Sequence, residues 1–341
     1  MYKRQGKDAK EDKSGLEDKF TLMNKALWTG GLFVHVPKGV TVDAPLVVMV
    51  NLPTKNTNAE GKTDSKTGKK APSGQAVFPR IVVVAEANSS VNFVMVTGSQ
   101  PGADKAKVDG TLTLASSVVE FHIEDGAKVS VAEVTNCSDD VFVVNRTRAF
   151  VGKDATIDFT AAGLGGKQIK SDIETILTAP GAQTDVRGVV LGDKNERYAY
   201  NTIAQHAAPD TRSNILFRVA LKDTSASIYQ GNVIVDKIAQ RTDAFQSNKN
   251  LLLGKEAKAD SIPKLEILAD DVKCSHGATV GPVDKEQLFY LTCRGLSTPE
   301  AEELIVTGFF QQVLDTTPIG GVGQWLADMT AEKIHGADGQ S

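Results

Sequence analysis

The part of the sequence whose residue types most suggest chemistry lies near the C-terminal end, where Cys274 and His276 stand two residues apart. If this segment forms a strand, both side chains share one face with Val272, Ala278 and Val280, because side chains alternate between the two sides of a strand. Thiolate sulfur and imidazole nitrogen are suitable ligands for iron, zinc or copper. The same alternation also fits two core residues, since the other three are small or apolar. Two ligands are too few for a closed site, so a metal would require groups from a second chain.

Signatures of catalysis are missing from the rest of the sequence. There is no phosphate-binding GxxxxGK[ST] loop, no GxSxG nucleophile elbow and no HExxH zinc helix. The adjacent carboxylates Asp270 and Asp271 would point to opposite faces of a strand and could not act as an acid and base pair. His206 lies in a turn-like segment, where we expect it to form hydrogen bonds between coils. These observations favour a chain without catalytic turnover of its own.

The composition is that of a globular protein. Of the 341 residues, 41% are hydrophobic and 23% are charged, so there is enough apolar surface to offset the entropy of ordering a core. The 38 Lys and Arg against 42 Asp and Glu give a net charge of −4, which argues against a nucleic-acid partner. Only 6% of the residues are aromatic and 30 are Gly, so small and β-branched residues must do most of the packing.

The number of cysteines and the lack of long apolar segments indicate in which compartment the protein works. Three cysteines without a CxxC pair indicate a reducing environment and not a disulfide framework. Cys137 is expected in an exposed turn without a basic neighbour, and Cys293 at a packed strand end. The first residues lack the apolar segment of a secretory signal, and no stretch reaches the roughly 18 apolar residues of a membrane span. We therefore expect a soluble, cytoplasmic protein without a membrane partner.

The chain divides into a tail, a long body and a short helical end. Residues 1–19 are mostly charged and are expected to form a flexible tail. Residues 20–296 form the predicted body, interrupted at 53–75 by a polar insertion rich in Lys, Thr, Gly and Ser that has the composition of a flexible loop. Residues 297–335 form the predicted helical region.

The body has the pattern of a solenoid. Short β-branched segments with alternating polarity are separated by turns that carry Gly-Ala or Asp-Ala pairs, at 126–127, 154–155 and 181–182, with Pro-Asp-Thr in the equivalent place at 209–211. These landmarks recur every 27 to 29 residues, a period typical of solenoids. The alternative of a β-sandwich is weakened because Asp-Gly, a common hairpin turn, occurs once. We predict an all-β fold, a right-handed parallel β-helix with a short α-helical C-terminal region.

The helical region begins with a clear start signal. Ser297, Thr298, Pro299 and Glu300 provide a hydroxyl cap, a proline at the start and an acid in the first turn. The apolar residues that follow at helical spacing are Ala301, Leu304, Ile305, Gly308, Phe309 and Val313. Such a short region cannot hold a core of its own. It must pack on the body, for example as a cap on the end of the solenoid, or on a partner.

The C-terminal sequence DDVKCSHGATVGPVDKEQLFYLTCRGLSTPEAEELIVTGFF resembles the SufB/SufD family of scaffold subunits in SUF iron–sulfur cluster assembly. The segments AQHAAPDTRSNILFRVAL, SIYQGNVIV and KIAQRTDAFQSNKNLLLG match the same family in order, and the resemblance extends over 28–314. It implies a right-handed parallel β-helix followed by short helices. Family members usually carry a longer helical region before the body, where this chain has the segment up to Lys19.

The resemblance also implies partners and cargo. SufB-type and SufD-type subunits pair through the C-terminal ends of their β-helices, and each docks a SufC-type ABC ATPase through its helical region. The docking helix would carry Glu300, Leu304, Ile305 and Phe309. A transient iron–sulfur cluster would form where the two subunits meet, and ATP would be bound by the ATPase and not by this chain.

Two positions indicate the SufD-type member of the pair. SufB-type chains carry a sulfur-accepting cysteine where this chain has Asn248, and a carboxylate where it has Gly277. The resemblance therefore makes His276 the first candidate for an interface ligand and Cys274 the second. One alternative is a homodimer that serves as both subunits. A remote alternative is a polysaccharide-active β-helix enzyme, against which the scarcity of aromatic residues and paired carboxylates argues.

Overall fold

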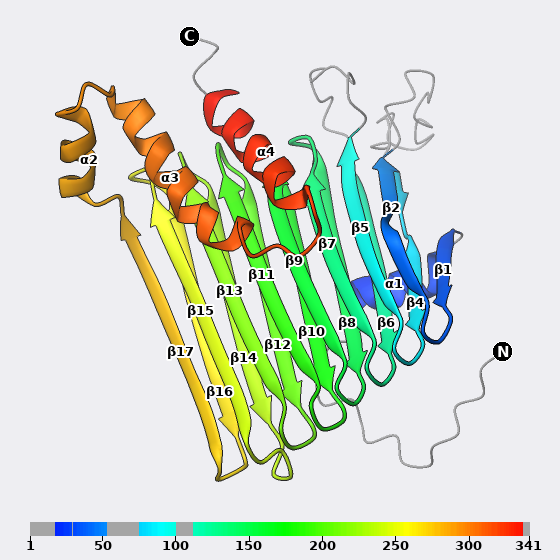
Figure 1. The fold of residues 1–341 in the computed structure, drawn as a ribbon. Helices are drawn as coiled ribbons and strands as arrows, with labels where there is room; N and C mark the ends of the chain where they lie inside the picture. Colours follow the sequence, from blue (N-terminus) through cyan, green and yellow to red (C-terminus); the bar gives the residue numbers. More distant parts are fainter. Residues whose placement is uncertain (1–17, 29, 53–74, 100–111, 337–341) are drawn as a thin grey trace, which may run out of the picture.

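The computed structural model describes residues 18–28, 30–52, 75–99 and 112–336. The predicted flexible tail and insertion therefore lie almost entirely outside the described residues. The described part is a two-sided parallel β-solenoid with helices on its outer surfaces, as predicted (Figure 1). None of its helices is long and apolar enough to cross a bilayer.

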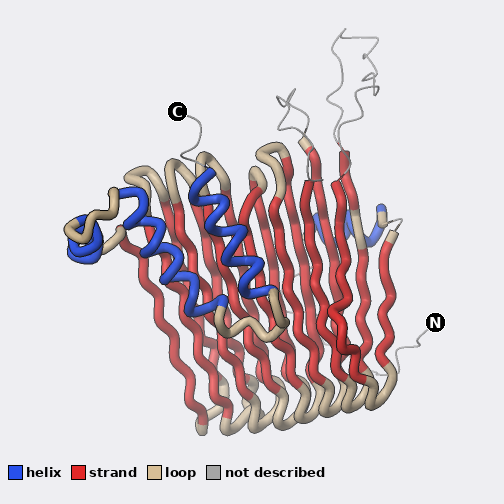
Figure 2. Tube along the Cα trace, turned by 45° about the horizontal axis from the view of Figure 1, so that its top comes forward, coloured by secondary structure: helices blue, strands red, loops and turns tan. Residues whose placement is uncertain are grey.

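Two parallel sheets form the two sides of the solenoid. Sheet A contains, in spatial order, β1 (Gly31–Val36), β4 (Arg80–Ala85), β6 (Thr113–Ile123), β8 (Val141–Val151), β10 (Gln168–Leu177), β12 (Arg197–His206), β14 (Ala226–Val235) and β16 (Lys258–Ile267), with the short β3 (Gln75–Val77) also paired to β6. Sheet B contains β2 (Thr41–Leu52), β5 (Ser90–Ser99), β7 (Lys128–Asn136), β9 (Thr156–Gly165), β11 (Gln183–Gly192), β13 (Arg212–Leu221), β15 (Thr242–Leu252) and β17 (Val272–Pro282). From β4 onward the chain alternates between the sheets, so each strand of sheet A and the following strand of sheet B form one coil (Figure 2).

The spacing of the coils confirms the predicted period. Between β6 and β17, residues in register are separated by 26 residues (Phe142 with Gln168) to 32 residues (Ala226 with Lys258). The predicted landmarks lie at a stacked corner, where each coil has a residue with positive φ; these residues are Asn88, Gly126, Asp154, Gly181, Asp210 and Arg241. Each backbone N–H there donates to a carbonyl of the next coil, which ties the corners into a ladder.

The corner favours Gly, Asn and Asp for a steric reason, and Arg241 is the exception among the six residues named above. Gly, Asn and Asp adopt positive φ most easily among the amino acids. A Cβ at Gly126 would lie 2.3 Å from Oδ1 of Asn88, and one at Gly181 would lie 2.0 Å from Oδ1 of Asp154. From Asn88 to Gly181, the corner therefore alternates between an Asn or Asp side chain and a glycine that leaves room for it.

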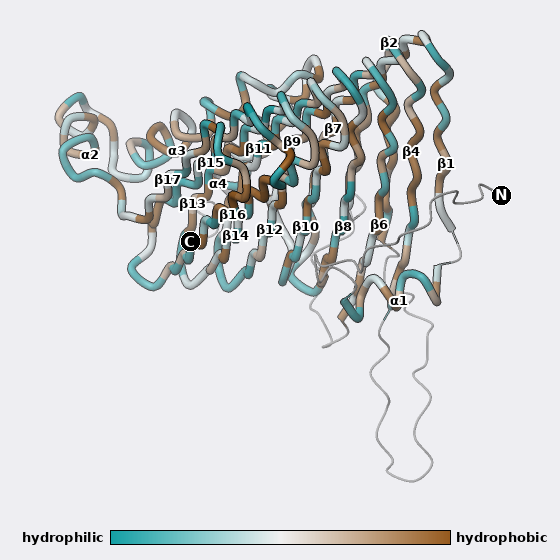
Figure 3. The backbone as a smooth tube through the Cα atoms, turned by 90° about the horizontal axis from the view of Figure 1, so that it is seen from below, coloured by the Kyte–Doolittle hydropathy of each residue, from teal (hydrophilic) through white to brown (hydrophobic). Residues whose placement is uncertain are grey.

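The main core fills the space between the two sheets. It consists mostly of Val, Ala and Ile, with a few aromatic pairs such as Phe93–Phe121 and Phe217–Tyr229. The turns that join the strands are largely hydrophilic (Figure 3). A narrow interior filled by small side chains agrees with the scarcity of aromatic residues in the sequence.

Helices cover parts of both outer surfaces. Helix α1 (Lys19–Leu27) lies on sheet A, where the amide of Asn24 donates to the carbonyls of Pro79 and Ser116. Helix α2 (Lys285–Thr292) follows the last strand and buries none of its residues, whereas α3 (Thr298–Leu314) and α4 (Val322–Gly336) lie across sheet B (Figure 1).

One boundary and the placement of one cysteine differ from the sequence-based expectation. The predicted body extends to residue 296, but its last strand ends at Pro282 and α2 begins at Lys285. Cys293, expected at a packed strand end, is the exposed C-terminal cap of α2. The start signal of α2 is Asp284, whose carboxylate accepts from the backbone N–H of Glu286 at 2.8 Å.

Candidate functional site at the open end of the solenoid

The C-terminal end of the solenoid is open. Strands β16 and β17 are the last strands of sheets A and B, and each pairs with a described strand on one edge alone. The other edges present unpaired backbone N–H and C=O groups, which makes them suitable for pairing with another chain. We call the two outer edges of β16 and β17 the open end.

Cys274 and His276 lie together at the open end. In the register of β17 on β15, Cys274 is beside Ala244 and His276 is beside Gln246. Ala244 and Gln246 are buried inside the solenoid, and residues in register on parallel strands point to the same side. Both candidate ligands therefore belong to the inward-facing side of β17, as the predicted alternation requires.

The two candidate ligands differ in burial. Cys274 is half-buried against the main core, and this burial raises the pKa of its thiol, partly offset by a backbone hydrogen bond from Ala244. His276 is exposed and makes no hydrogen bond or ion pair with any described residue. Both interpretations of Cys274 thus keep support, because it contacts the core and also lies beside the open end. In the described part of the chain, no group of three or more His, Cys, Asp or Glu side chains could hold a metal ion.

Three buried amides lie behind these ligands, on the inward face of β15. We call Gln246, Asn248 and Asn250 the amide cluster. The Nδ2 of Asn250 donates to Oδ1 of Asn248 at 2.6 Å and to the carbonyl of Thr279 on β17 at 3.1 Å. Asn248 stands where the resemblance places the sulfur-accepting cysteine. Gln246 and Asn250 were not predicted as site residues from the sequence. The available signal was the spacing of three polar residues, two apart, on one face of a strand.

Helix α3 buries a face that coincides with the expected one only at Ala301 and Val313. Its buried residues are Ala301, Val306, Phe310, Val313 and Leu314. These pack with α4 and with Val94, Ala132, Val134, Ala162, Leu164, Val189, Leu191 and Ala220 on the outer face of sheet B. The helix is apolar on more than one side, so its sequence alone did not decide which side would be buried. The helical region does not cap the end of the solenoid; it lies along its side.

The four residues expected on the docking helix have different environments. Leu304 is 52% exposed, and Ile305 and Phe309 are half-buried. The guanidinium of Arg218 lies 5.8 Å from the centre of the Phe309 ring. Glu300 accepts from the backbone N–H and the hydroxyl of Ser297, which completes the N-terminal cap of α3 and lowers the pKa of Glu300. Leu304 thus offers the most exposed apolar surface of the four.

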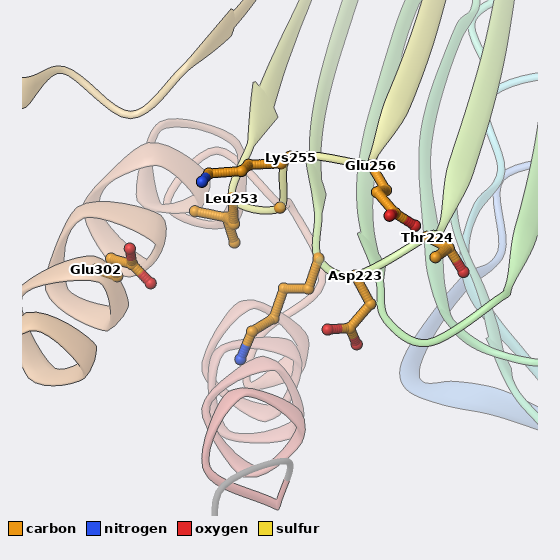
Figure 4. Close-up of a pocket in the computed structure, with 8 residues that line it drawn as sticks. Asp223, Thr224, Leu253, Lys255, Glu256 and Glu302 are labelled. Carbon is orange, nitrogen blue, oxygen red and sulfur yellow. The ribbon is translucent and has the colours of Figure 1, made fainter.

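A shallow pocket separates α3 from the turns at the top of β13 and β15 (Figure 4). Lys222, Asp223, Lys255 and Glu256 line it from the turns, and Glu302 lines it from α3. Positive and negative side chains alternate around this opening. It offers no pair of groups arranged for catalysis.

Two other sequence-based expectations have clear outcomes. Cys137 is buried, not exposed, and its thiol donates to the carbonyl of Thr97 at 3.5 Å; burial raises the pKa of this thiol to about 12. His206 is buried and its two ring nitrogens contact the hydroxyls of Thr211 and Ser213 at 2.7 and 2.8 Å. His206 thus forms hydrogen bonds as expected, but from the end of β12 across the turn to β13 of the same coil and not between coils.

Comparisons with known proteins identify the family of this chain. The family model described as "SUF system FeS cluster assembly, SufBD core domain" matches residues 67–309. The chain is 30% identical to the iron–sulfur cluster assembly protein SufD of Bacillus subtilis strain 168, over 93% of this chain and 67% of that protein. It is 29% identical to an iron–sulfur cluster assembly SufBD family protein of Staphylococcus epidermidis, over 89% of this chain and 60% of that protein. The chain belongs to the SufBD family.

Membership in the SufBD family confirms the predicted resemblance and gives the open end a context. The matched region covers the solenoid from before β3 into α3 and includes Cys274 and His276. The chain is a homologue of the Bacillus subtilis protein named iron–sulfur cluster assembly protein SufD. It spans about 60% of the length of the staphylococcal relatives that it matches.

Proposed function

We propose that this chain is a SufD-type scaffold subunit that pairs through its open end with a SufB-type subunit and docks a SufC-type ATPase on α3. The single observation that carries the proposal is the position of His276 beside Cys274 at the unpaired end of a SufBD-family solenoid. A strand of a second chain could extend sheet A or sheet B there through backbone hydrogen bonds.

The cargo is an iron–sulfur cluster formed between the two chains. Such clusters are held mainly by cysteine thiolates, with histidine replacing cysteine at some irons. His276 contributes one ligand, and Cys274 is the second candidate. The partner supplies the remaining ligands and the sulfur, because this chain has an amide, Asn248, in place of the sulfur-accepting cysteine.

The ATPase docks on the outer side of α3. The inner side of this helix is already packed on sheet B, so the exposed Leu304 and the half-buried Ile305 provide the available apolar contacts. A movement of the ATPase that displaces α3 would be transmitted to sheet B through two hydrogen bonds. The guanidinium of Arg218 donates to Gln312 on α3, and that of Arg187 donates to the hydroxyl of Thr316 just after the helix. The SufC-type partner binds the ATP, and this chain acts without turnover of its own.

Co-expression with the SufB-type and SufC-type proteins of the same organism tests the proposal. We expect one complex of the three proteins that carries an iron–sulfur chromophore after reconstitution. Leu304→Asp should release the ATPase alone, whereas the control Ile238→Asp, at a residue that is 67% exposed in a distant turn, should not. His276→Ala should keep the complex and lower the cluster yield, with His122→Ala on the outer face of sheet A as the control.

Contrary outcomes are equally clear. Three proteins that elute separately would overturn the scaffold assignment. A stable homodimer that assembles a cluster without a SufB-type partner would favour the alternative of one chain serving as both subunits. Equal cluster yield from His276→Ala and the parent protein would leave His276 without a role as ligand.

A further inference from the structure

Gln246 is the residue of the amide cluster that lies beside His276. The two residues are in register on β15 and β17, and neighbouring strands in a sheet are about 4.8 Å apart. Gln246 is fully buried, whereas His276 is exposed and has no hydrogen-bond partner in the described part of the chain. The imidazole is therefore free to turn about its side-chain bonds toward Gln246.

The amide of Gln246 has an unused acceptor. Its Nε2 lies 3.4 Å from the carbonyl oxygen of Gly231 on the opposite sheet, and its Oε1 has no hydrogen-bond partner among the described residues. The orientation of the amide follows from Gly231, because exchanging its O and N would bring two oxygens together. A buried acceptor without a partner is costly and rare, so a donor is expected to reach it.

Gly231 makes room for this side chain. A Cβ at Gly231 would lie 2.3 Å from Nε2 and 2.7 Å from Oε1 of Gln246. Any other residue there would push the amide out of its place in the interior. The glycine and the glutamine thus form a matched pair, one coil below the open end.

In the other two amides of the cluster, Nδ2 of Asn248 and Oδ1 of Asn250 also have no partner among the described residues, but these residues do not stand beside His276. Asn250 bonds to Asn248 and to the backbone of β17, which fixes β17 on β15 next to His276. Asn248 is in register with Ala278 and not with His276. Gln246 is consequently the member of the cluster placed to act on the imidazole.

We propose that Gln246 is the positioning residue of His276: its Oε1 accepts a hydrogen bond from one imidazole N–H and so leaves the other ring nitrogen unprotonated and directed toward the open end. This inference rests on the proposed function of His276 as a ligand. A histidine that binds a metal commonly donates its other ring N–H to an oxygen, which fixes the tautomer and the orientation of the ring.

The test measures the tautomer populations of the His276 imidazole by NMR, in the isolated full-length chain labelled with 15N-histidine. Ring nitrogen shifts report the tautomer, and the signals of His276 are those lost in His276→Ala. We expect one tautomer to predominate in the parent protein and a more even mixture in Gln246→Met, which keeps the volume but removes the acceptor. The control Gln205→Met, on the outer face of sheet A, should leave the signals of His276 unchanged.

A second variant separates positioning from a general loss of structure. Gln246→Glu keeps an oxygen acceptor at the same point, so we expect the tautomer preference of His276 to survive in this variant. Unchanged tautomer populations in Gln246→Met, or a loss of the preference in Gln246→Glu as large as in Gln246→Met, would overturn the inference.

The readout is independent of the partners. If the tautomer responds to Gln246 but cluster yield does not respond to His276, the positioning stands and the proposed ligand role fails. If cluster yield responds to His276 and the tautomer ignores Gln246, the ligand role stands and the positioning fails.

Discussion

Individual polar side chains inside the solenoid show how a narrow interior accommodates charge. Glu133 on β7 is completely buried, and its carboxyl accepts from the Nδ2 of Asn145 at 3.0 Å and from the hydroxyls of Ser171 and Thr147 at 3.1 and 3.3 Å. Burial raises the pKa of Glu133 despite these three hydrogen bonds. The interior thus favours uncharged polar groups, and the amide cluster follows the same rule.

The buried histidine gives a prediction about pH. Burial lowers the pKa of His206 from 6.5 to about 4, so between these values the unfolded chain binds more protons than the folded one. Stability from this group is therefore present above pH 6.5 and is lost as the pH falls toward 4, by about 3 kcal/mol in total. Urea unfolding from pH 4 to pH 8 should show a steeper loss in the parent protein than in His206→Gln. Identical pH profiles would contradict the assigned pKa.

At the scale of residues, only part of the site could be predicted from the sequence. Alternation along β17 correctly predicted that Cys274 and His276 share a face. The burial of Cys137 depends on a neighbouring coil, through Thr97, and no local pattern contains that information. The partnership of Gln246 with Gly231 likewise joins two sheets whose contact is set by the number of residues in the intervening turn.

At the scale of elements, the corners were predictable and the helix packing was not. Gly and Asp at a corner are demanded by local backbone geometry, so the landmarks at Gly126, Asp154 and Gly181 were visible in the sequence. Helix α3 was predicted with its correct start because capping is also local. Its buried face depends on sheet B, which no helical periodicity describes.

The stacked corner gives a second prediction. Gly181→Ala should destabilise the protein by about 1 to 3 kcal/mol, because φ is +76° and the new Cβ would lie 2.0 Å from Oδ1 of Asp154. Gly277→Ala on β17 is the matched control, since a Cβ there meets no atom within 4 Å and φ is not positive. Thermal unfolding of both variants checks this. A loss at Gly277 as large as that at Gly181 would refute the steric explanation.

The packing of α3 on sheet B gives a third prediction. Phe310 is fully buried between the helix and the sheet, so Phe310→Ala should cost about 3 to 5 kcal/mol locally. We expect α3 and α4 to become sensitive to limited proteolysis while the solenoid resists. Leu304→Ala, on the exposed side, should leave the digestion pattern unchanged. Protection of α3 in the Phe310 variant would argue against this interface as its main anchor.

At the scale of the whole molecule, the period of the landmarks was enough to predict a solenoid. A repeat of this length cannot close a core by itself, so stacking of coils follows from it. The sequence did not reveal where the helical region would lie, because that depends on a flat strip of small residues exposed by sheet B. Ala132, Ala162 and Ala220 lie on three different strands and form this strip only after the coils have stacked.

A solenoid in which every coil touches only its neighbours should not open everywhere at once. Hydrogen–deuterium exchange should be slowest in the central strands and fastest at β1 and β17, since opening a terminal coil breaks a single interface. A flat profile along the chain would contradict this one-dimensional behaviour.

The helices that cross sheet B alter this picture on one side. The apolar cluster that they form with sheet B extends from Val94 on β5 to Leu251 on β15. The ammonium of Lys333 on α4 also contacts the carboxylate of Glu196 at 2.7 Å and the carbonyl of Leu164 at 2.9 Å. They therefore hold several coils together, and we expect opening from the C-terminal end to stop near β15. The last strands, β16 and β17, lie beyond these helices. This end, which carries His276, remains able to move while the rest of the solenoid stays rigid.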